Sequence, residues 1–198
     1  MFMKKLTFLI LTIFCACNTL ETKTSESEND ITKSIKSDND WKTLTTNSRK
    51  FTEAIINSNY DLGAIDWKDL AEVSKISGIS VSDLQSMMQA SKVAGQRLKE
   101  KLGAFTATEG CATCRRTEQE NIAKFMQTIT ELKKDPKLAD KFYNNLVDEG
   151  PGCPIVFYAC VATCAATIEF FPLYLACCTV CLCEFCDNPP VSVCGSVA

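Results

Sequence analysis

The sequence predicts an all-α protein, a small helical module followed by a disulfide-rich helical hairpin. Apolar residues recur at intervals of three and four along residues 41–149, and capping residues bound several of these runs. Residues 151–198 then contain two Cys-x3-Cys pairs, a spacing that places both thiols of a pair on one helix face. Residues 41–149 contain no repeat and no strand-forming run.

Composition excludes several classes of function. The 198 residues include 13 cysteines and no histidine, which rules out Ser-His-Asp or Cys-His catalysis and zinc sites with histidine ligands. The formal net charge of -3 argues against a nucleic-acid-binding protein, and no glycine-rich phosphate loop is present. We therefore expect no enzyme activity, no cofactor and no nucleic-acid partner.

Residues 1–17 have the layout of a signal peptide. Two lysines precede an uncharged, mostly apolar run at residues 6–14, which is too short to cross a bilayer. Ala16 followed by Cys17 resembles the lipobox of bacterial lipoproteins, which implies that Cys17 carries a lipid. An ordinary cleaved signal is the alternative. Both predict an exported chain, either anchored at the cell surface by lipid or extracellular.

The polar segment of residues 18–40 is predicted to be a disordered linker, because it has too few apolar side chains to offset the entropy of ordering. Helical periodicity begins directly after it. The apolar face of the first predicted helix contains Trp41, Leu44, Phe51 and Ile55. A shorter second helix is expected around Trp67 and Leu70.

Three further helices follow in the same module. Ser82 and Gln85 form a capping-box pattern at the start of the third, and Thr117 and Glu120 form one at the start of the fourth. A fifth helix is expected over residues 137–148, after a proline that ends the fourth. These patterns predict a helical module or pro-region over residues 41–149.

The segment of residues 70–85 resembles a helix-turn-helix motif. The gap from Ala71 to Gly78 is longer than that motif's turn, and an exported protein meets no operator DNA. The motif therefore does not change the expectation that nucleic acid is not a partner.

Charge divides the chain at Gly150-Pro151. All 21 Lys and Arg residues and 21 of the 24 acidic residues precede this point, so the first part is neutral overall. Residues 151–198 contain no basic residue, three acidic residues and nine cysteines. An exported segment this short and this rich in cysteine is predicted to be a disulfide-stabilised unit.

The spacing of four cysteines predicts how this unit folds. Cys160 and Cys164 lie one helical turn apart, and Cys177 and Cys181 repeat the spacing. Pro172 lies between the pairs and disfavours a continuous helix, so the chain is expected to fold back there. In an antiparallel hairpin, facing residues have numbers that add up to one constant total. The pairs Cys160–Cys181 and Cys164–Cys177 share such a total, and we predict both disulfides, with Cys164→Ser loosening only the tail.

The pairing of the other tail cysteines is left open by the sequence. They are Cys153, Cys178, Cys183, Cys186 and Cys194. Because nine is an odd number, one tail cysteine pairs with Cys111 or Cys114, stays free, or links two chains. Two Cys-x2-Cys pairs within residues 178–186 have zinc-knuckle spacing, but export favours disulfides and we expect no metal.

Cys111-Ala-Thr-Cys114 stands just before the fourth predicted helix. A helix N-terminus lowers the pKa of the first thiol of such a motif, and the second thiol resolves a mixed disulfide. Thioredoxin-like enzymes place the motif in a βαβ unit, which the helical pattern here does not provide. A structural disulfide is therefore the favoured interpretation, with thiol–disulfide exchange as an alternative.

Residues 155–185 form a long apolar run. Glu169 and Pro172 divide it into two arms, each shorter than the roughly 20 residues that a spanning helix needs. Disulfide-clamped apolar arms can still dock on a bilayer as a unit. The tail lacks the basic face that binds anionic lipids, so any action on membranes is expected to be hydrophobic or led by a receptor.

The order of an export signal, a helical region and a compact cysteine-dense tail resembles the precursors of halocin-type cysteine-rich bacteriocins. The Cys111-x2-Cys114 motif and the cysteines between residues 153 and 177 resemble that family's spacing, over the last third of the chain. The resemblance implies a released antimicrobial peptide that acts on a target-cell membrane or a receptor on it, with export and immunity proteins as partners. The alternative is a surface lipoprotein whose hairpin is a binding or structural module.

Overall fold

A computed structural model provides the structure. It describes residues 30–103, 117–135, 137–140, 142, 153–166, 169–187, 189 and 191–194. All regular secondary structure in these ranges is helical, which confirms the predicted all-α class. The predicted signal peptide with Cys17 and the Cys111-x2-Cys114 motif lie outside the described residues.

The first long helix, α2 (Asn39–Ile56), begins after Asp38, whose carboxylate accepts a hydrogen bond from the backbone N–H of Asp40. The predicted apolar face is buried against the rest of the protein. It includes Trp41, Leu44, Phe51 and Ile55, none of which is more than 1% exposed. The sequence periodicity therefore identified the correct face of this helix.

Helical structure starts earlier than the sequence predicts. Residues 30–37 are helical, and Ile35 is only 6% exposed. Ile31 and Ile35 lie one turn apart and both pack against the core, so their burial offsets the entropy of ordering this segment. The prediction of a disordered linker over residues 18–40 is wrong from residue 30 onward.

A short 3-10 turn, η1 (Leu62–Ala64), separates α2 from α3 (Leu70–Ser77). The second predicted helix starts later than expected, because the side chain of Asp69 caps α3. Trp67 precedes the helix but is still part of the core, where its ring meets Phe125 edge-on with centroids 4.8 Å apart. The periodic pattern therefore indicated burial correctly and the helix start incorrectly.

The next helix, α4 (Val81–Lys101), begins after Ser80 and not at the predicted Ser82. The Ser80 hydroxyl accepts the backbone N–H three residues further on, so the actual cap lies two residues earlier than expected. Because α3 continues to Ser77, only residues 78–80 separate the two helices, and Gly78 takes a left-handed φ of 67°. The sequence-based statement that this gap is too long for a helix-turn-helix is wrong.

Two acidic residues at the start of α2 face two basic residues at the end of α4. Lys101 Nζ lies 2.7 Å from a carboxylate oxygen of Asp38 and 3.0 Å from one of Asp40, and Arg97 lies 3.5 Å from Asp40. Burial raises the pKa of Asp38, but hydrogen bonds from the Lys101 side chain and the Asp40 backbone outweigh it. The pKa of Asp38 therefore lies below its usual value of 3.8.

This lowered pKa predicts a dependence of stability on pH. The ionised Asp38 stabilises the fold above its unfolded pKa, and the contribution disappears as the pH falls through the lower folded pKa. Asp38→Asn keeps a capping side chain but removes the charge, so it should lower the melting temperature at pH 7 and have little effect at about pH 2. At pH 7 the melting temperatures of the variant and the unsubstituted protein should differ only slightly, because Lys101 is half-exposed and solvent weakens its interaction with Asp38. An equal difference in melting temperature at both pH values would contradict this.

The helix α5 (Glu118–Lys134) begins with the capping box that the sequence predicts. Glu120 N–H donates to the Thr117 hydroxyl oxygen, and Thr117 N–H donates to the Glu120 carboxylate. Residues 137–140 and 142 are also helical and belong to the fifth predicted helix, whose remainder lies outside the described residues.

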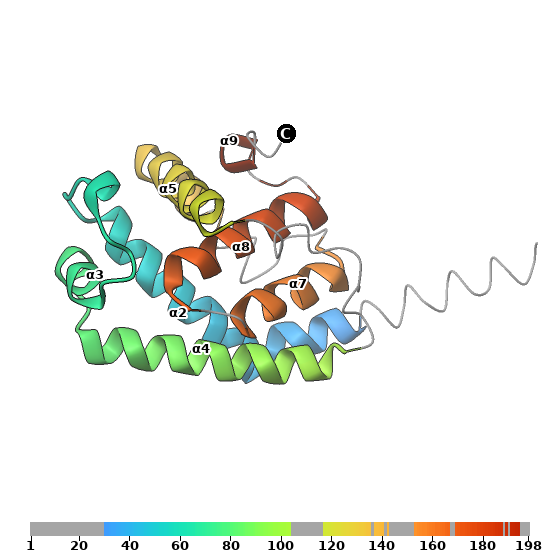
Figure 1. Ribbon diagram of the computed structural model, residues 1–198. Helices are drawn as coiled ribbons and strands as arrows, with labels where there is room; N and C mark the ends of the chain where they lie inside the picture. The colour runs from blue at the N-terminus through green and yellow to red at the C-terminus, as the bar shows by residue number, and fades with distance from the viewer. Residues whose placement is uncertain are drawn as a thin grey trace, which may run out of the picture.

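The tail forms two antiparallel helices, α7 (Ile155–Ala166) and α8 (Phe171–Phe185), and a short third one, α9 (Val191–Cys194). Pro172 lies in the first turn of α8, where its missing N–H costs no hydrogen bond. The helical hairpin that the sequence predicts is therefore present (Figure 1).

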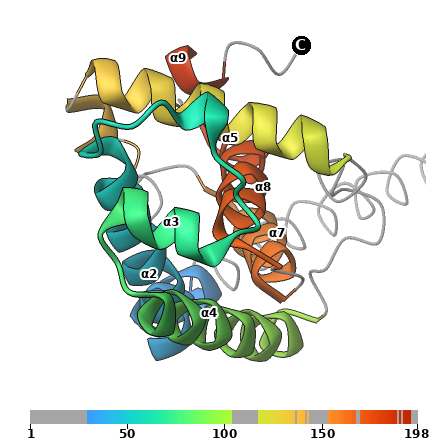
Figure 2. The ribbon, with the colours of Figure 1, turned by 60° about the vertical axis from the view of Figure 1, so that its left-hand side comes forward.

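The hairpin lies in the middle of the molecule. In Figure 1, α7 lies between α4 and α8, and α8 lies between α7 and α5, which agrees with the contacts between these helices. Figure 2 shows α4 at one end of this stack and α5 at the other, and α2 runs along its side with contacts to α4, α5 and α8. A single apolar core contains residues from α2, α4 and α5 together with residues from both arms of the hairpin. The charge boundary at Gly150-Pro151 therefore marks a change of composition and not a division of the core.

Gly95 allows α4 and α7 to approach closely. A Cβ atom placed on Gly95 would lie 2.5 Å from the Cβ of Ala165 and 2.7 Å from the backbone nitrogen of Ala166. Two of its three nearest atoms belong to the backbone of α7, which cannot move aside as a side chain can. Glycine is therefore required here by packing.

This close approach predicts that Gly95→Ala destabilises the protein by about 1–3 kcal/mol through overpacking. In an exposed helix position the same change would stabilise by about 1 kcal/mol, so the sign of the effect is diagnostic. Urea unfolding measures it. Ala90→Gly at an exposed position of α4 is the matched control and should cost about 1 kcal/mol. A stabilising Gly95→Ala would show that the two helices are further apart.

Candidate functional site

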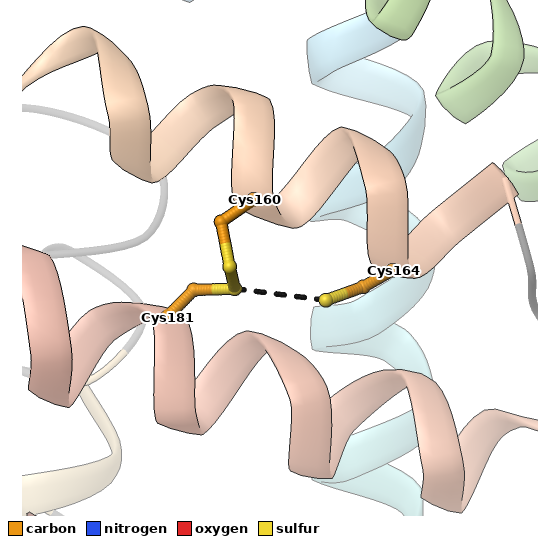
Figure 3. Close-up of side chains that lie close together, drawn as sticks. All are labelled: Cys160, Cys164 and Cys181. Carbon is orange, nitrogen blue, oxygen red and sulfur yellow. Dashed lines mark hydrogen bonds between the residues drawn. A yellow bond between two sulfur atoms is a disulfide. The ribbon is translucent and has the colours of Figure 1, made fainter. Parts of the chain in front are cut away.

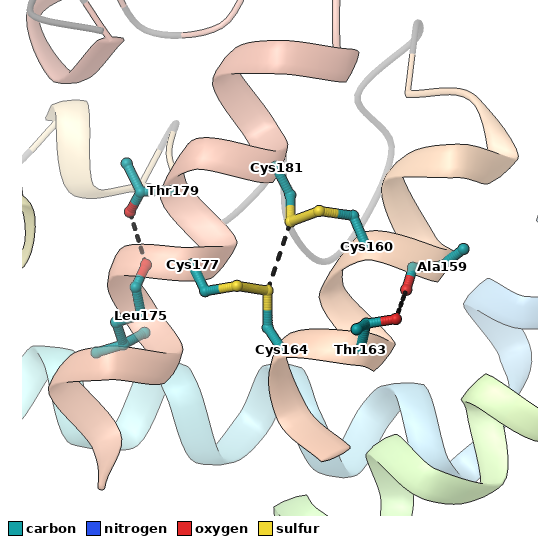
Figure 4. Close-up of a disulfide and its surroundings, with 8 residues drawn as sticks. All are labelled: Ala159, Cys160, Thr163, Cys164, Leu175, Cys177, Thr179 and Cys181. Carbon is teal, nitrogen blue, oxygen red and sulfur yellow. Dashed lines mark hydrogen bonds between the residues drawn. A yellow bond between two sulfur atoms is a disulfide. The ribbon is translucent and has the colours of Figure 1, made fainter. Parts of the chain in front are cut away.

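Two disulfides join α7 to α8 in the predicted register. Cys160 is bonded to Cys181 with a Cα separation of 5.9 Å, and Cys164 is bonded to Cys177 with a Cα separation of 5.8 Å (Figure 4). Both separations lie within the range that disulfide geometry allows. Helical spacing places both sulfurs of each arm on the face toward the other arm.

Two more disulfides close the unit. Cys153–Cys186 joins the start of α7 to the end of α8, and Cys183–Cys194 attaches α9 to α8. All four disulfides in the described part of the chain lie within residues 153–194, and none joins this segment to α2, α3, α4 or α5. The hairpin with α9 is therefore a covalently closed unit, which contacts the helical module through packing.

Cys178 is the free cysteine of the described tail, which selects one of the three alternatives that the sequence leaves open. It is 2% exposed, and burial raises its pKa to about 12 although a hydrogen bond with the Tyr174 side chain opposes this. A buried thiol that is protonated at neutral pH is a poor nucleophile. Its burial also prevents a link to a second chain.

Sulfur atoms gather between the two arms. The Sγ atoms of Cys160, Cys164 and Cys181 lie within 4.8 Å of one another (Figure 3). Cys164 Sγ and Cys181 Sγ are 3.6 Å apart, and since both are disulfide sulfurs without hydrogen, this is a van der Waals contact between neighbouring disulfides. Zinc requires thiolates, so these sulfurs could bind it only after reduction. The cysteines with zinc-knuckle spacing do not converge, because Cys181, Cys183 and Cys186 belong to three different disulfides.

The hairpin helices are apolar on nearly all sides. The buried residues of α7 are Ile155, Phe157, Tyr158, Ala159, Cys160, Val161, Ala162, Cys164 and Ala165. The larger part of α8 is buried as well, and residues 151–198 contain no Lys or Arg. A helix that is apolar all round needs either protein or lipid around it.

Aromatic side chains of α2 cover both arms of the hairpin. The Trp41 ring centroid lies 4.8 Å from that of Tyr158 and 6.1 Å from that of Phe157, both in α7. Phe51 stacks on Phe171 at the start of α8, with centroids 4.8 Å apart. Burial raises the pKa of Tyr158 to about 12. These contacts make the module a close-fitting cover for the hairpin.

A buried lysine holds the end of the tail. Lys124 of α5 is 5% exposed, and its Nζ donates a hydrogen bond of 2.8 Å to the carbonyl oxygen of Val193 in α9. Together with the Cys183–Cys194 disulfide, this charge-assisted bond fixes α9 against α5. Sequence reasoning missed Lys124, because nothing local distinguishes it from the solvent-exposed lysines of the module.

Comparisons with models of protein families, with curated proteins and with solved structures find no match for this chain. Four disulfides in one short segment are typical of proteins that mature in an oxidising compartment, and the tail is a cysteine-rich module of the secreted or extracellular kind. Among the described helices, none combines the length and the apolar character required to cross a membrane.

Proposed function

We propose that the chain is the exported precursor of a bacteriocin-like antimicrobial peptide, with residues 151–198 as the effector and residues 41–149 as a helical pro-region. The observation that carries the proposal is the covalent closure of residues 153–194 by four disulfides internal to that segment. Cross-links of this kind restrict the unfolded chain, so they help such a unit keep its shape after a backbone cut ahead of it.

The packing of the hairpin supports a covering role for the pro-region. Helices α2, α4 and α5 bury the apolar arms, and once exposed, these arms would bind other apolar surfaces, including a bilayer. The tail has no basic residue, so its action on a target-cell membrane is hydrophobic or led by a receptor. Export and immunity proteins are the other expected partners, and Cys17 is the expected lipid-attachment residue if the signal is of the lipoprotein type.

A cleavable variant tests this proposal. The Gly150-Pro151 segment is replaced by the recognition site of a specific protease, and the oxidised protein is cleaved and separated into its two parts. We expect the tail to release dye from phosphatidylcholine vesicles or to inhibit growth of related bacteria, and the uncut protein to do neither. The same tail after reduction and alkylation is the control and should be inactive. Intact vesicles and normal growth with the oxidised tail would contradict the proposal.

A second candidate is a surface lipoprotein in which the hairpin stays within the intact chain as a binding or structural module. The shared core favours this candidate, because Gly95 and Trp41 pack directly on α7. Removing the hairpin would expose the apolar side chains of the helical module to solvent. The mass of the native protein separates the two. The precursor should yield a free peptide that begins near Gly150-Pro151, whereas the lipoprotein should be one chain lipidated at Cys17.

A further inference from the structure

The two disulfides between α7 and α8 touch each other through one sulfur of each. The Sγ atom of Cys164 lies 3.6 Å from that of Cys181 and within 4.8 Å of that of Cys160 (Figure 3). Cys177 does not belong to this group of three close sulfurs. The Cys164–Cys177 disulfide therefore approaches its neighbour through Cys164.

Access from solvent is unequal among the four cysteines. Cys177 is half-buried, whereas Cys160, Cys164 and Cys181 are 6%, 3% and 0% exposed. Cys177 is therefore the residue of the four at which an external thiol has the easiest approach. Attack at its sulfur makes Cys164 the leaving group, and this is the sulfur that lies against the second disulfide.

We infer that Cys160, Cys164, Cys177 and Cys181 form a disulfide-exchange relay, in which an external dithiol that reacts at Cys177 produces a free thiol at Cys160. In the first step the dithiol's thiolate bonds to Cys177 Sγ, the Cys164–Cys177 bond breaks, and the electron pair remains on Cys164 Sγ. In the second step Cys164 Sγ bonds to Cys181 Sγ, the Cys160–Cys181 bond breaks, and Cys160 takes up a proton.

The dithiol's second thiol then displaces Cys177 from the mixed disulfide, and Cys177 is protonated. The dithiol has lost two electrons and two protons, and the chain has gained two thiols, at Cys160 and Cys177, with one disulfide remaining at Cys164–Cys181. Cys164 leaves as a thiolate 3.6 Å from Cys181 Sγ, so the inner step needs no deprotonation. It does need a rotation of the Cys164 side chain that brings its sulfur in line with the Cys160–Cys181 bond.

The exchange has a consequence for the hairpin. After one two-electron reduction the remaining bond is the diagonal Cys164–Cys181, which still joins α7 to α8. Its two sulfurs belong to residues that are 3% and 0% exposed, so the surviving clamp is the one that an external thiol reaches least easily. The relay therefore moves the reducible bond away from solvent.

A pair of single variants tests the inner step. In Cys177→Ala, the thiol of Cys164 lies against the Cys160–Cys181 disulfide, whereas in Cys164→Ala the orphan thiol of Cys177 lies outside the group of close sulfurs. Each oxidised full-length variant is incubated at about pH 8.5, quenched with acid, labelled with N-ethylmaleimide in denaturant, and cut at Glu169 so that mass spectrometry assigns label and linkage to each arm.

Within this group each Cys177→Ala molecule has one free thiol. We expect the label at Cys160 in the molecules that have a new Cys164–Cys181 linkage, and at Cys164 in the rest. Cys164→Ala should carry label at Cys177 and keep Cys160–Cys181. Label confined to Cys164 in the first variant, or equal scrambling in both, would overturn the inference. Cys178 is labelled in both and serves as the internal reference.

Partial reduction of the unsubstituted protein tests the relay independently of how the variants fold. The oxidised chain is treated with one equivalent of dithiothreitol, quenched and mapped in the same way. Among molecules with two labels on these four cysteines, we expect labels on Cys160 and Cys177. Labels on Cys164 and Cys177 with Cys160–Cys181 intact would show that no exchange takes place.

Discussion

Replacing Trp41 by alanine is expected to lower the free energy of unfolding by about 3–5 kcal/mol, the range for removal of a large buried aromatic side chain. Trp41 is 1% exposed and packs against Tyr158 and Phe157, so the change leaves a cavity between α2 and α7. Urea unfolding followed by circular dichroism gives the free energy. We also expect faster amide exchange in α7, because this helix loses its aromatic cover.

The control for this prediction is Tyr60→Ala. Tyr60 is 46% exposed and its ring contacts the ammonium group of Lys75 at 6.0 Å, a contact worth about 0.5–1 kcal/mol at an exposed site. Its loss should leave the stability and the exchange of α7 nearly unchanged. A Trp41→Ala protein as stable as Tyr60→Ala would contradict the packing of α2 on the hairpin.

Removing the Cys164–Cys177 clamp by replacing both cysteines with alanine is expected to cost about 3 kcal/mol, because the bond closes a short loop in the unfolded chain. The two residues are 13 apart in sequence. The double replacement leaves neither Cys164 nor Cys177 as an orphan thiol. Since α7 and α8 share one core with α2, α4 and α5, we expect one cooperative transition at a lower urea concentration, which differs from the sequence-based expectation of a loosened tail beside folded helices.

The Cys183→Ala/Cys194→Ala double variant is the matched control. Its disulfide spans 11 residues and attaches α9, at the edge of the tail, so its loss should raise amide exchange mainly in α9. Circular dichroism and amide exchange distinguish this control from the Cys164/Cys177 double variant. Two separate transitions in the Cys164/Cys177 variant would show that the hairpin unfolds independently of the helical module.

Several features of the fold were predictable because they depend on residues close together in sequence. The capping box of Thr117 and Glu120 needs a hydroxyl and a carboxylate three positions apart, and both bonds are present. The register of the hairpin follows from two Cys-x3-Cys pairs and one intervening proline, since these determine which residues face each other. The short-range failures at Ser82 and Trp67 arose where a neighbouring Ser80 or Asp69 was the better cap.

Other features depend on contacts between segments that are distant in sequence. From the sequence alone, Gly95 is expected to make its helix slightly less stable. Only the close approach of α7 shows that packing requires a glycine at this position. Lys124 reads as a surface lysine, and only the position of α9 gives its ammonium group a buried carbonyl partner. The pairs Cys153–Cys186 and Cys183–Cys194 likewise required the path of the chain after α8.

The sequence by itself determined the all-α class, the antiparallel hairpin and the pairing of its four inner cysteines, because helix periodicity and cysteine spacing are local. Tertiary structure alone decided that the hairpin lies between α4 and α5 at the centre of one core, that Cys178 is the free thiol, and that the inner disulfides touch at Cys164 and Cys181. The arms of the hairpin are apolar all round, so no periodic stripe in their sequence shows which neighbour covers each face.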